Sequence, residues 1–165
     1  MCVQIAIGGI RFGFDSNFEM VIEESLIPFL YFEENKCDVN IKIIWNGKKA
    51  VKPQGKMSGE DLLIEYYHQQ EQTVCLAKGG VGRYLSTTVC DASFTSLECQ
   101  LHFKPVGFMK SLGNLLRLLP MCTILQRNGV MFFHASQIEI KGKGILFTAP
   151  SGTGKTTQAK LWKKY

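Results

Sequence analysis

The sequence contains no hydrophobic segment long enough to cross a membrane as a helix. Such a helix needs about 20 consecutive apolar residues, but the most apolar stretch, residues 107–133, is interrupted by Lys110, Arg117, Pro120 and Arg127. The N-terminus has no basic segment ahead of an apolar one, so it does not resemble a secretory signal. We therefore expect no contact with a membrane and a cytoplasmic location.

The Cys-x-x-Cys spacing of structural zinc sites and of many redox centres is also absent. Without a signal peptide, we interpret the cysteines as reduced thiols of a cytosolic protein. The six cysteines are spread along the 165 residues at Cys2, Cys37, Cys75, Cys90, Cys99 and Cys122. The sequence therefore predicts neither a disulfide framework nor a zinc site.

A strong excess of one charge is missing as well. Nineteen Lys and Arg against fourteen Asp and Glu give a net charge of +5, and the basic residues are scattered. A nucleic-acid-binding surface requires clustered positive charge, so we expect no nucleic-acid partner. The 45% of hydrophobic residues is typical of a globular protein.

Turn signals at regular intervals divide the first hundred residues into short β-strands. Asn46-Gly47 follows one of them and is the signal of a two-residue type I′ hairpin. The spacing of the later strands predicts an antiparallel meander. We expect strands at residues 3–7, 39–43, 73–78, 83–89 and 97–103.

Two other segments of this part allow two interpretations each. In residues 61–70, Ser58 and Asp61 resemble a capping box that would open a helix, whereas the aromatic residues favour a strand. Residues 29–32 (FLYF) fit the core of the sheet, with an exposed groove for an extended peptide as the alternative.

Beyond Pro105 the pattern changes to helices followed by strands. Because residues 145–147 are continuously apolar, we expect that strand to be buried on both faces. Gly129 suits the position after a helix. We expect helices at residues 111–119, at 121–128 and from Lys155 onward, and strands at 130–134, 138–141 and 145–148.

These patterns predict an α/β chain, α+β overall, in two parts. A β-rich N-terminal domain covers residues 1–105. An incomplete second domain over residues 106–165 comprises a helical pair, strands and a glycine-rich segment before the last helix.

That segment, residues 149–156 (APSGTGKT), fits the relaxed pattern of a phosphate-binding loop and is called the glycine-rich loop below. Its glycines would let backbone N–H groups approach phosphates, and the following helix would add the positive end of its dipole. Lys155 could reach the β- and γ-phosphates of ATP, and the Thr156 hydroxyl could bind Mg²⁺. The alternative is a strand-to-helix turn with a surface lysine.

The stretch from Phe132 to Trp162 resembles the start of the C-terminal domain of the HPr kinase/phosphorylase family. His134, Glu139, the turn at Gly142 and the glycine-rich loop fall at matching positions, although Ala149 replaces the usual glycine. The resemblance covers residues 107–165. It implies a fold similar to phosphoenolpyruvate carboxykinase and transfer of phosphate from ATP and Mg²⁺ to a serine of a protein or, as in relatives beside peptide gene clusters, of a peptide.

By this resemblance His134 and Lys155 are the expected catalytic residues. Without it, His134 reads more simply as a partly buried histidine bonded to a backbone carbonyl. Thr156 is the expected metal ligand. The expected cofactor-binding residues are Ser151, Gly152, Thr153, Gly154, Lys155, Thr156 and Thr157.

An acidic residue after the loop is missing. Magnesium and the serine nucleophile both need carboxylates, but no Asp or Glu follows Thr156. We therefore expect that the sequence is part of a longer product, or that a second chain or another copy completes the sheet.

The sequence as a whole predicts an ATP-dependent serine kinase similar to HPr kinase. A nucleotide-binding module without catalytic activity is one alternative. A small-molecule kinase or carboxykinase-type enzyme is the other.

Overall fold

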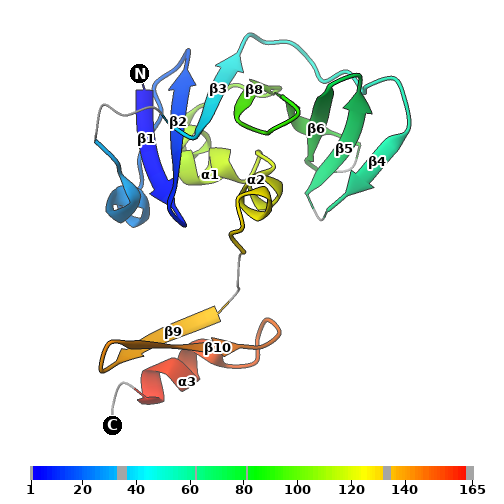
Figure 1. Ribbon diagram of the computed structural model, residues 1–165. Helices are drawn as coiled ribbons and strands as arrows, with labels where there is room; N and C mark the ends of the chain where they lie inside the picture. Colours follow the sequence, from blue (N-terminus) through cyan, green and yellow to red (C-terminus); the bar gives the residue numbers. More distant parts are fainter. Residues whose placement is uncertain (1, 33–36, 62, 81, 132–134, 163–165) are drawn as a thin grey trace. The chain divides into compact units, whose positions relative to one another are not determined.

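A computed structural model describes residues 2–32, 37–61, 63–80, 82–131 and 135–162. They form two compact units, Met1–Val130 and Met131–Tyr165, which are described separately (Figure 1). The structure is of the mixed α and β class, with one large sheet and short helices. Within the described residues, none of the helices has the length and apolar character needed to span a bilayer.

The first unit is built on an eight-stranded sheet with the order β1-β2-β3-β8-β7-β6-β5-β4. Gly8 and Gly9 join its first two strands and both have positive φ, +60° and +82°, as a type I′ turn requires. The strands are β1 (Cys2–Ile7), β2 (Ile10–Ser16), β3 (Val39–Trp45), β4 (Met57–Glu60), β5 (Ile64–Gln69), β6 (Gln72–Lys78), β7 (Tyr84–Cys90) and β8 (Ser96–Leu101).

Strand β3 lies between β2 and β8 and runs parallel to both. The hairpin predicted at Asn46-Gly47 is therefore wrong, because both edges of β3 are already paired. Side chains hold β3 at its two ends. The Arg11 guanidinium donates to both Asp38 carboxylate oxygens (2.8 and 3.0 Å), and the Asn17 amide exchanges two hydrogen bonds with the Trp45 backbone (2.9 and 3.0 Å).

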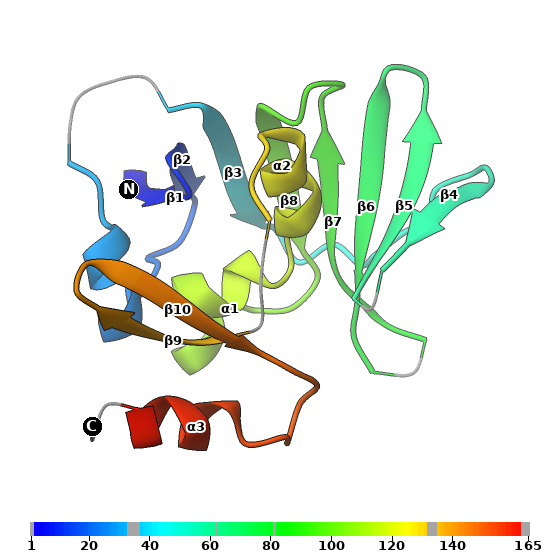
Figure 2. The ribbon, with the colours of Figure 1, turned by 60° about the horizontal axis from the view of Figure 1, so that its bottom comes forward.

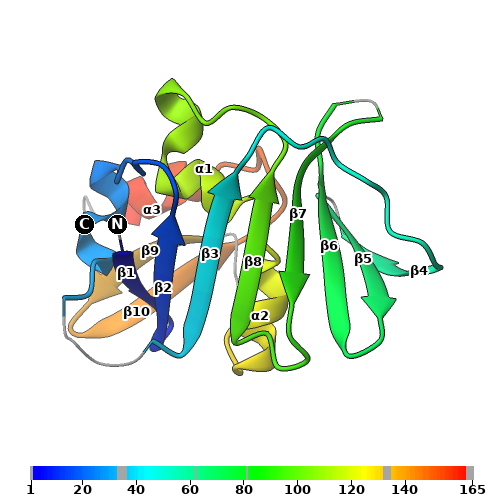
Figure 3. The same cartoon turned by 90° about the horizontal axis from the view of Figure 1, so that it is seen from above.

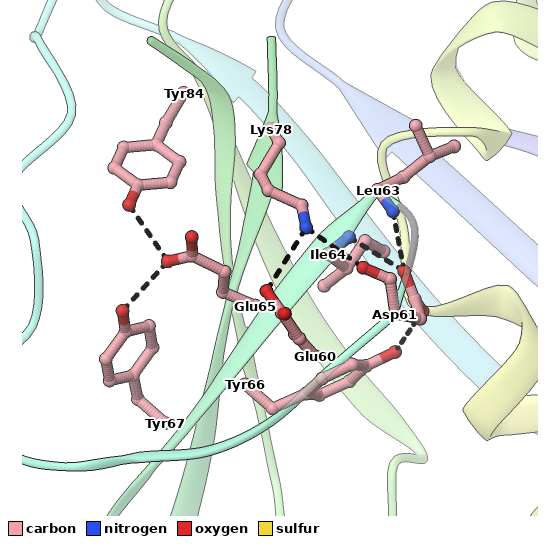
Figure 4. Close-up of polar contacts among 9 residues, drawn as sticks. All are labelled: Glu60, Asp61, Leu63, Ile64, Glu65, Tyr66, Tyr67, Lys78 and Tyr84. Carbon is pink, nitrogen blue, oxygen red and sulfur yellow. Dashed lines mark hydrogen bonds and ion pairs between the residues drawn. The ribbon is translucent and has the colours of Figure 1, made fainter. Parts of the chain in front are cut away.

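The antiparallel meander is confirmed, since β4 to β8 pair in chain order. Residues 61–70 contain a strand, not a helix. An Asp61 carboxylate oxygen accepts the N–H groups of Leu63 and Ile64 (both 2.8 Å), so it shapes a turn at the start of β5 (Figure 4).

The helices α1 (Leu112–Leu116) and α2 (Met121–Arg127) lie on one face of this sheet (Figure 2 and Figure 3). Two 3₁₀ helices, η1 (Glu24–Phe29) and η2 (Gly107–Lys110), complete the unit. Leu112 and Leu125 are fully buried in the same core as Phe12 and Phe14. The helical pair expected at the start of the second domain thus belongs to the hydrophobic core of the first unit.

The expectation that residues 29–32 are core is wrong for its two phenylalanines, because Phe29 is 43% and Phe32 is 85% exposed. The segment instead reaches the outer edge of β1. Leu30 forms a bridge with Ile5, and the Tyr31 N–H donates to the Gln4 carbonyl (2.9 Å). This pairing covers part of an otherwise open sheet edge.

The second unit is a hairpin of β9 (Ala135–Ile140) and β10 (Lys143–Thr148), with α3 (Lys155–Trp162) packed on it. The Phe147 and Trp162 rings meet edge to face at 5.8 Å. The expectation of a doubly buried strand at residues 145–148 is wrong, because Leu146 is 52% exposed. Successive side chains of a strand point to opposite faces, so Leu146 points away from the face where Phe147 meets α3.

Replacing Phe12, which has no exposed surface, should test the core of the first unit. Removing a buried phenylalanine ring leaves a cavity, so we expect Phe12→Ala to lower the free energy of unfolding by about 3–5 kcal/mol. Phe32→Ala is the matched control and should change it by less than about 0.5 kcal/mol. Urea denaturation followed by circular dichroism measures both, and equal losses would contradict this account of the core.

Candidate functional site

The glycine-rich loop connects the end of β10 at Thr148 to the start of α3 at Lys155. The strand, loop and helix predicted here are therefore present. The N–H groups of the first turn of an α-helix have no partner within the helix. The Gln158 N–H, which donates to the Gly154 carbonyl (2.9 Å), is at the fourth position of α3. The amides before it are therefore placed where an anion can accept their hydrogen bonds.

Two glycines give the loop its curvature. Gly152 has φ +82° and Gly154 has φ +85°, a conformation that other residues adopt only with strain. A Cβ at either position would meet no other atom within 4 Å, so the surroundings are open to a ligand. Ala149 is not among the described residues with positive φ, which explains why alanine is tolerated in place of the usual glycine.

Lys155 folds back over the loop. Its ammonium group donates to the carbonyl oxygens of Ala149 (2.8 Å) and Pro150 (3.0 Å). An ammonium group has three donors, so one remains for another acceptor. The Thr153 hydroxyl also donates to the Pro150 carbonyl (2.7 Å). These bonds hold a positive charge next to the turn that the two glycines form.

Ser136 was missed by the sequence analysis. Its hydroxyl lies 3.3 Å from that of Thr156, the expected metal ligand. Ser136 pairs with Phe147 and lies two residues before the buried Ile138, so it shares the face of the hairpin that α3 covers. The period of two counted back from Ile138 could have indicated this position.

The resemblance also pointed to His134 and Glu139. His134 lies outside the described residues. Glu139 is exposed and pairs with Gly144, next to the Lys141-Gly142 turn, whereas the loop follows Thr148 at the other end of β10. The described part of the chain has no group of three or more His, Cys, Asp or Glu that could hold a metal.

A separate polar cluster lies in the first unit. The Glu65 carboxylate accepts the hydroxyls of Tyr67 (2.8 Å) and Tyr84 (2.9 Å) (Figure 4). Burial alone would raise the Glu65 pKa, but these two hydrogen bonds, together with the positive charges of Lys52 and Lys78, lower it. Both phenols are thus tied to the sheet by an ionised acid, and we interpret the cluster as structural.

Cys75, Cys90, Cys99 and Cys122 are thiols outside any disulfide. Cys75 and Cys90 lie on neighbouring strands with their sulfur atoms 3.9 Å apart. Burial raises the pKa of Cys99 to about 11. A buried thiol that stays protonated is a poor nucleophile and a poor metal ligand, so Cys75, Cys90 and Cys99 act as core side chains.

Comparison with known proteins adds no relative: no protein-family model matches the chain, and no curated protein or solved structure matches it significantly. The geometry of the glycine-rich loop therefore carries the functional argument.

Replacing Gly154 should destabilise the glycine-rich loop locally. An Ala at φ +85° is strained by about 1–2 kcal/mol, so we expect Gly154→Ala to speed exchange of the Gln158 amide, which donates to the Gly154 carbonyl, about tenfold. Gly144→Ala is the control, because its Cβ would meet only the movable Gln137 side chain at 3.3 Å. Hydrogen–deuterium exchange with mass spectrometry on the whole chain measures both, and equal protection in the two variants would contradict the strain.

Proposed function

We propose that this chain binds ATP with Mg²⁺ at the glycine-rich loop and transfers the γ-phosphoryl group to a serine hydroxyl of a protein or peptide. The observation that carries the proposal is the position of the Lys155 ammonium group, 2.8 and 3.0 Å from the carbonyls at the start of a loop with two left-handed glycines. This combination places a cation and free backbone donors together, as a polyphosphate requires.

The residues of the loop fit the phosphate chain of a nucleotide. The backbone N–H groups before Gln158 would donate to phosphate oxygens, and the Lys155 ammonium would turn from its two carbonyls toward the β- and γ-phosphates. Bound Mg²⁺ would neutralise charge on the same phosphates. The Thr156 hydroxyl would be the ligand from this chain, and Ser136 would orient that hydroxyl.

Catalysis in this proposal depends on positioning and electrostatics. Charge that develops on the phosphoryl group would be stabilised by fixed donors in the loop. The serine acceptor is proposed from the resemblance of residues 107–165 to the HPr kinase family. His134 would lie beside the phosphate in that arrangement.

A second candidate function is nucleotide binding without catalysis. Among the residues that the structure describes, no group of three or more His, Cys, Asp or Glu could hold a metal, and Glu139 is near the end of the hairpin opposite the loop. Phosphoryl transfer requires a group that orients the attacking hydroxyl. The two functions share the loop and differ only in turnover.

Binding is tested by isothermal titration of the whole chain with Mg·ATP. Because a charge-assisted hydrogen bond contributes about 1.5–3 kcal/mol, we expect Lys155→Ala to weaken binding by roughly 10- to 100-fold. Lys160→Ala, on the same helix and exposed, is the control and should bind like the wild type. Absence of heat with the wild-type chain would refute the proposed function, and equal affinity of both variants would refute the role of Lys155.

Transfer is tested with γ-³²P-labelled ATP and two degenerate peptide pools that differ only in Ser or Ala at one fixed position. We expect label in the serine pool alone, and none with Lys155→Ala, because the loop positions the phosphoryl group for a hydroxyl. ATP binding without labelling of either pool would select the non-catalytic function. Labelling of small hydroxyl metabolites instead would select a small-molecule kinase.

A further inference from the structure

A cavity of about 240 Å³ opens between the sheet and the helices of the first unit. Its walls come from the strands β6 and β7, from η2 and from α1 with the residues beside them. Most of the lining is apolar and consists of Leu63, Ala77, Leu85, Phe103, Met109 and Leu118. The cavity is in a different unit from the glycine-rich loop.

The charged residues that line this cavity are both cationic, Lys78 and Arg117. The Lys78 ammonium donates to the Asp61 carbonyl (3.0 Å) and lies 3.4 Å from the Glu60 carboxylate (Figure 4). Arg117 is exposed, and its side chain has no hydrogen bond or ion pair with any residue that the structure describes. A guanidinium with all its donors available beside an apolar cavity is suited to a carboxylate.

The size of the cavity limits what can enter it. Pockets for drug-sized ligands are roughly 300–1,000 Å³, so 240 Å³ suits one large apolar side chain. Apolar side chains near the cavity are exposed: Leu63 of its lining is 47% exposed, and in the segment that supplies the lining residue Met109, Val106 and Phe108 are 54% and 75% exposed. A small molecule inside the cavity would leave these exposed side chains in water, whereas a peptide chain that continues past Leu63 and η2 would cover them.

We infer that the first unit carries a docking site for a peptide that presents a large apolar side chain next to an acidic residue. The apolar side chain would fill the cavity as the anchor, which is where interface energy concentrates. The neighbouring carboxylate would pair with the Arg117 guanidinium. The site goes beyond the proposed phosphoryl transfer, and its occupation does not require a nucleotide.

The test uses the whole chain, without nucleotide, and four fluorescein-labelled peptides. They share a Gly-Ser background and carry Phe-Glu, Phe-Gln, Ser-Glu or Ser-Gln at the two central positions. Fluorescence anisotropy gives each dissociation constant. We expect the Phe-Glu peptide to bind most tightly, with each single replacement weakening binding by about three- to tenfold, equivalent to about 0.7–1.4 kcal/mol.

A charge exchange makes the test specific for Arg117. Arg117→Glu should weaken binding of the Phe-Glu peptide by about tenfold or more. A Phe-Lys peptide should bind this variant more tightly than it binds the wild type. Lys42→Glu is the matched control, because it changes the net charge equally from the exposed side of β3. Arg117 is exposed, so the variant should retain the wild-type thermal melting curve, which is recorded in parallel.

Three results would overturn the inference. Equal affinity for all four peptides would refute the proposed roles of both the apolar side chain and the carboxylate. Equal effects of Arg117→Glu and Lys42→Glu would show only a general charge effect. Free 3-phenylpropionate that binds as tightly as the Phe-Glu peptide would show a small-molecule pocket instead of a docking site. Failure of ATP binding would leave this inference standing, because none of these measurements contains a nucleotide.

Discussion

The parallel pairing of β3 with both β2 and β8 is the constraint on which the first unit depends. It joins the N-terminal hairpin to the antiparallel meander and makes one sheet of the two. Parallel neighbours require long connections, and the chain supplies them on both sides of β3. The Arg11–Asp38 pair and the Asn17–Trp45 hydrogen bonds hold the two ends of the strand, and the pairing with Arg11 lowers the pKa of Asp38 to about 2.

The second unit has far less to hold it together. A two-stranded hairpin is marginally stable alone, and here its support is α3, through the buried Ile138 and Ala159 and the contact of Phe147 with Trp162. The glycine-rich loop connects β10 to α3, so the contacts that stabilise the unit also fix the conformation of the loop. A strand held against a helix start is a physical means of fixing amides around an anion.

The two proposed sites depend on different kinds of interaction. The loop would bind through backbone donors and one ammonium group. The cavity would bind through apolar burial, with the Arg117 charge selecting the neighbouring residue. The first kind of site can be predicted from local sequence, since residues 149–156 are contiguous. The second kind brings residues 63, 77, 85, 103 and 117 together from separate elements, and no local pattern indicates it.

The sequence by itself determined the short-range features: the meander spacing, the break at Gly129 and the loop between a strand and a helix, because glycine placement and hydrophobic period act over a few residues. It could not decide strand neighbours, and so Asn46-Gly47 was wrongly predicted to close a hairpin. Only the tertiary structure placed Ser136 beside Thr156, exposed Leu146 and assigned the helical pair to the first core. Each of these depends on which distant segment covers a face, and long-range packing, not local preference, sets that choice.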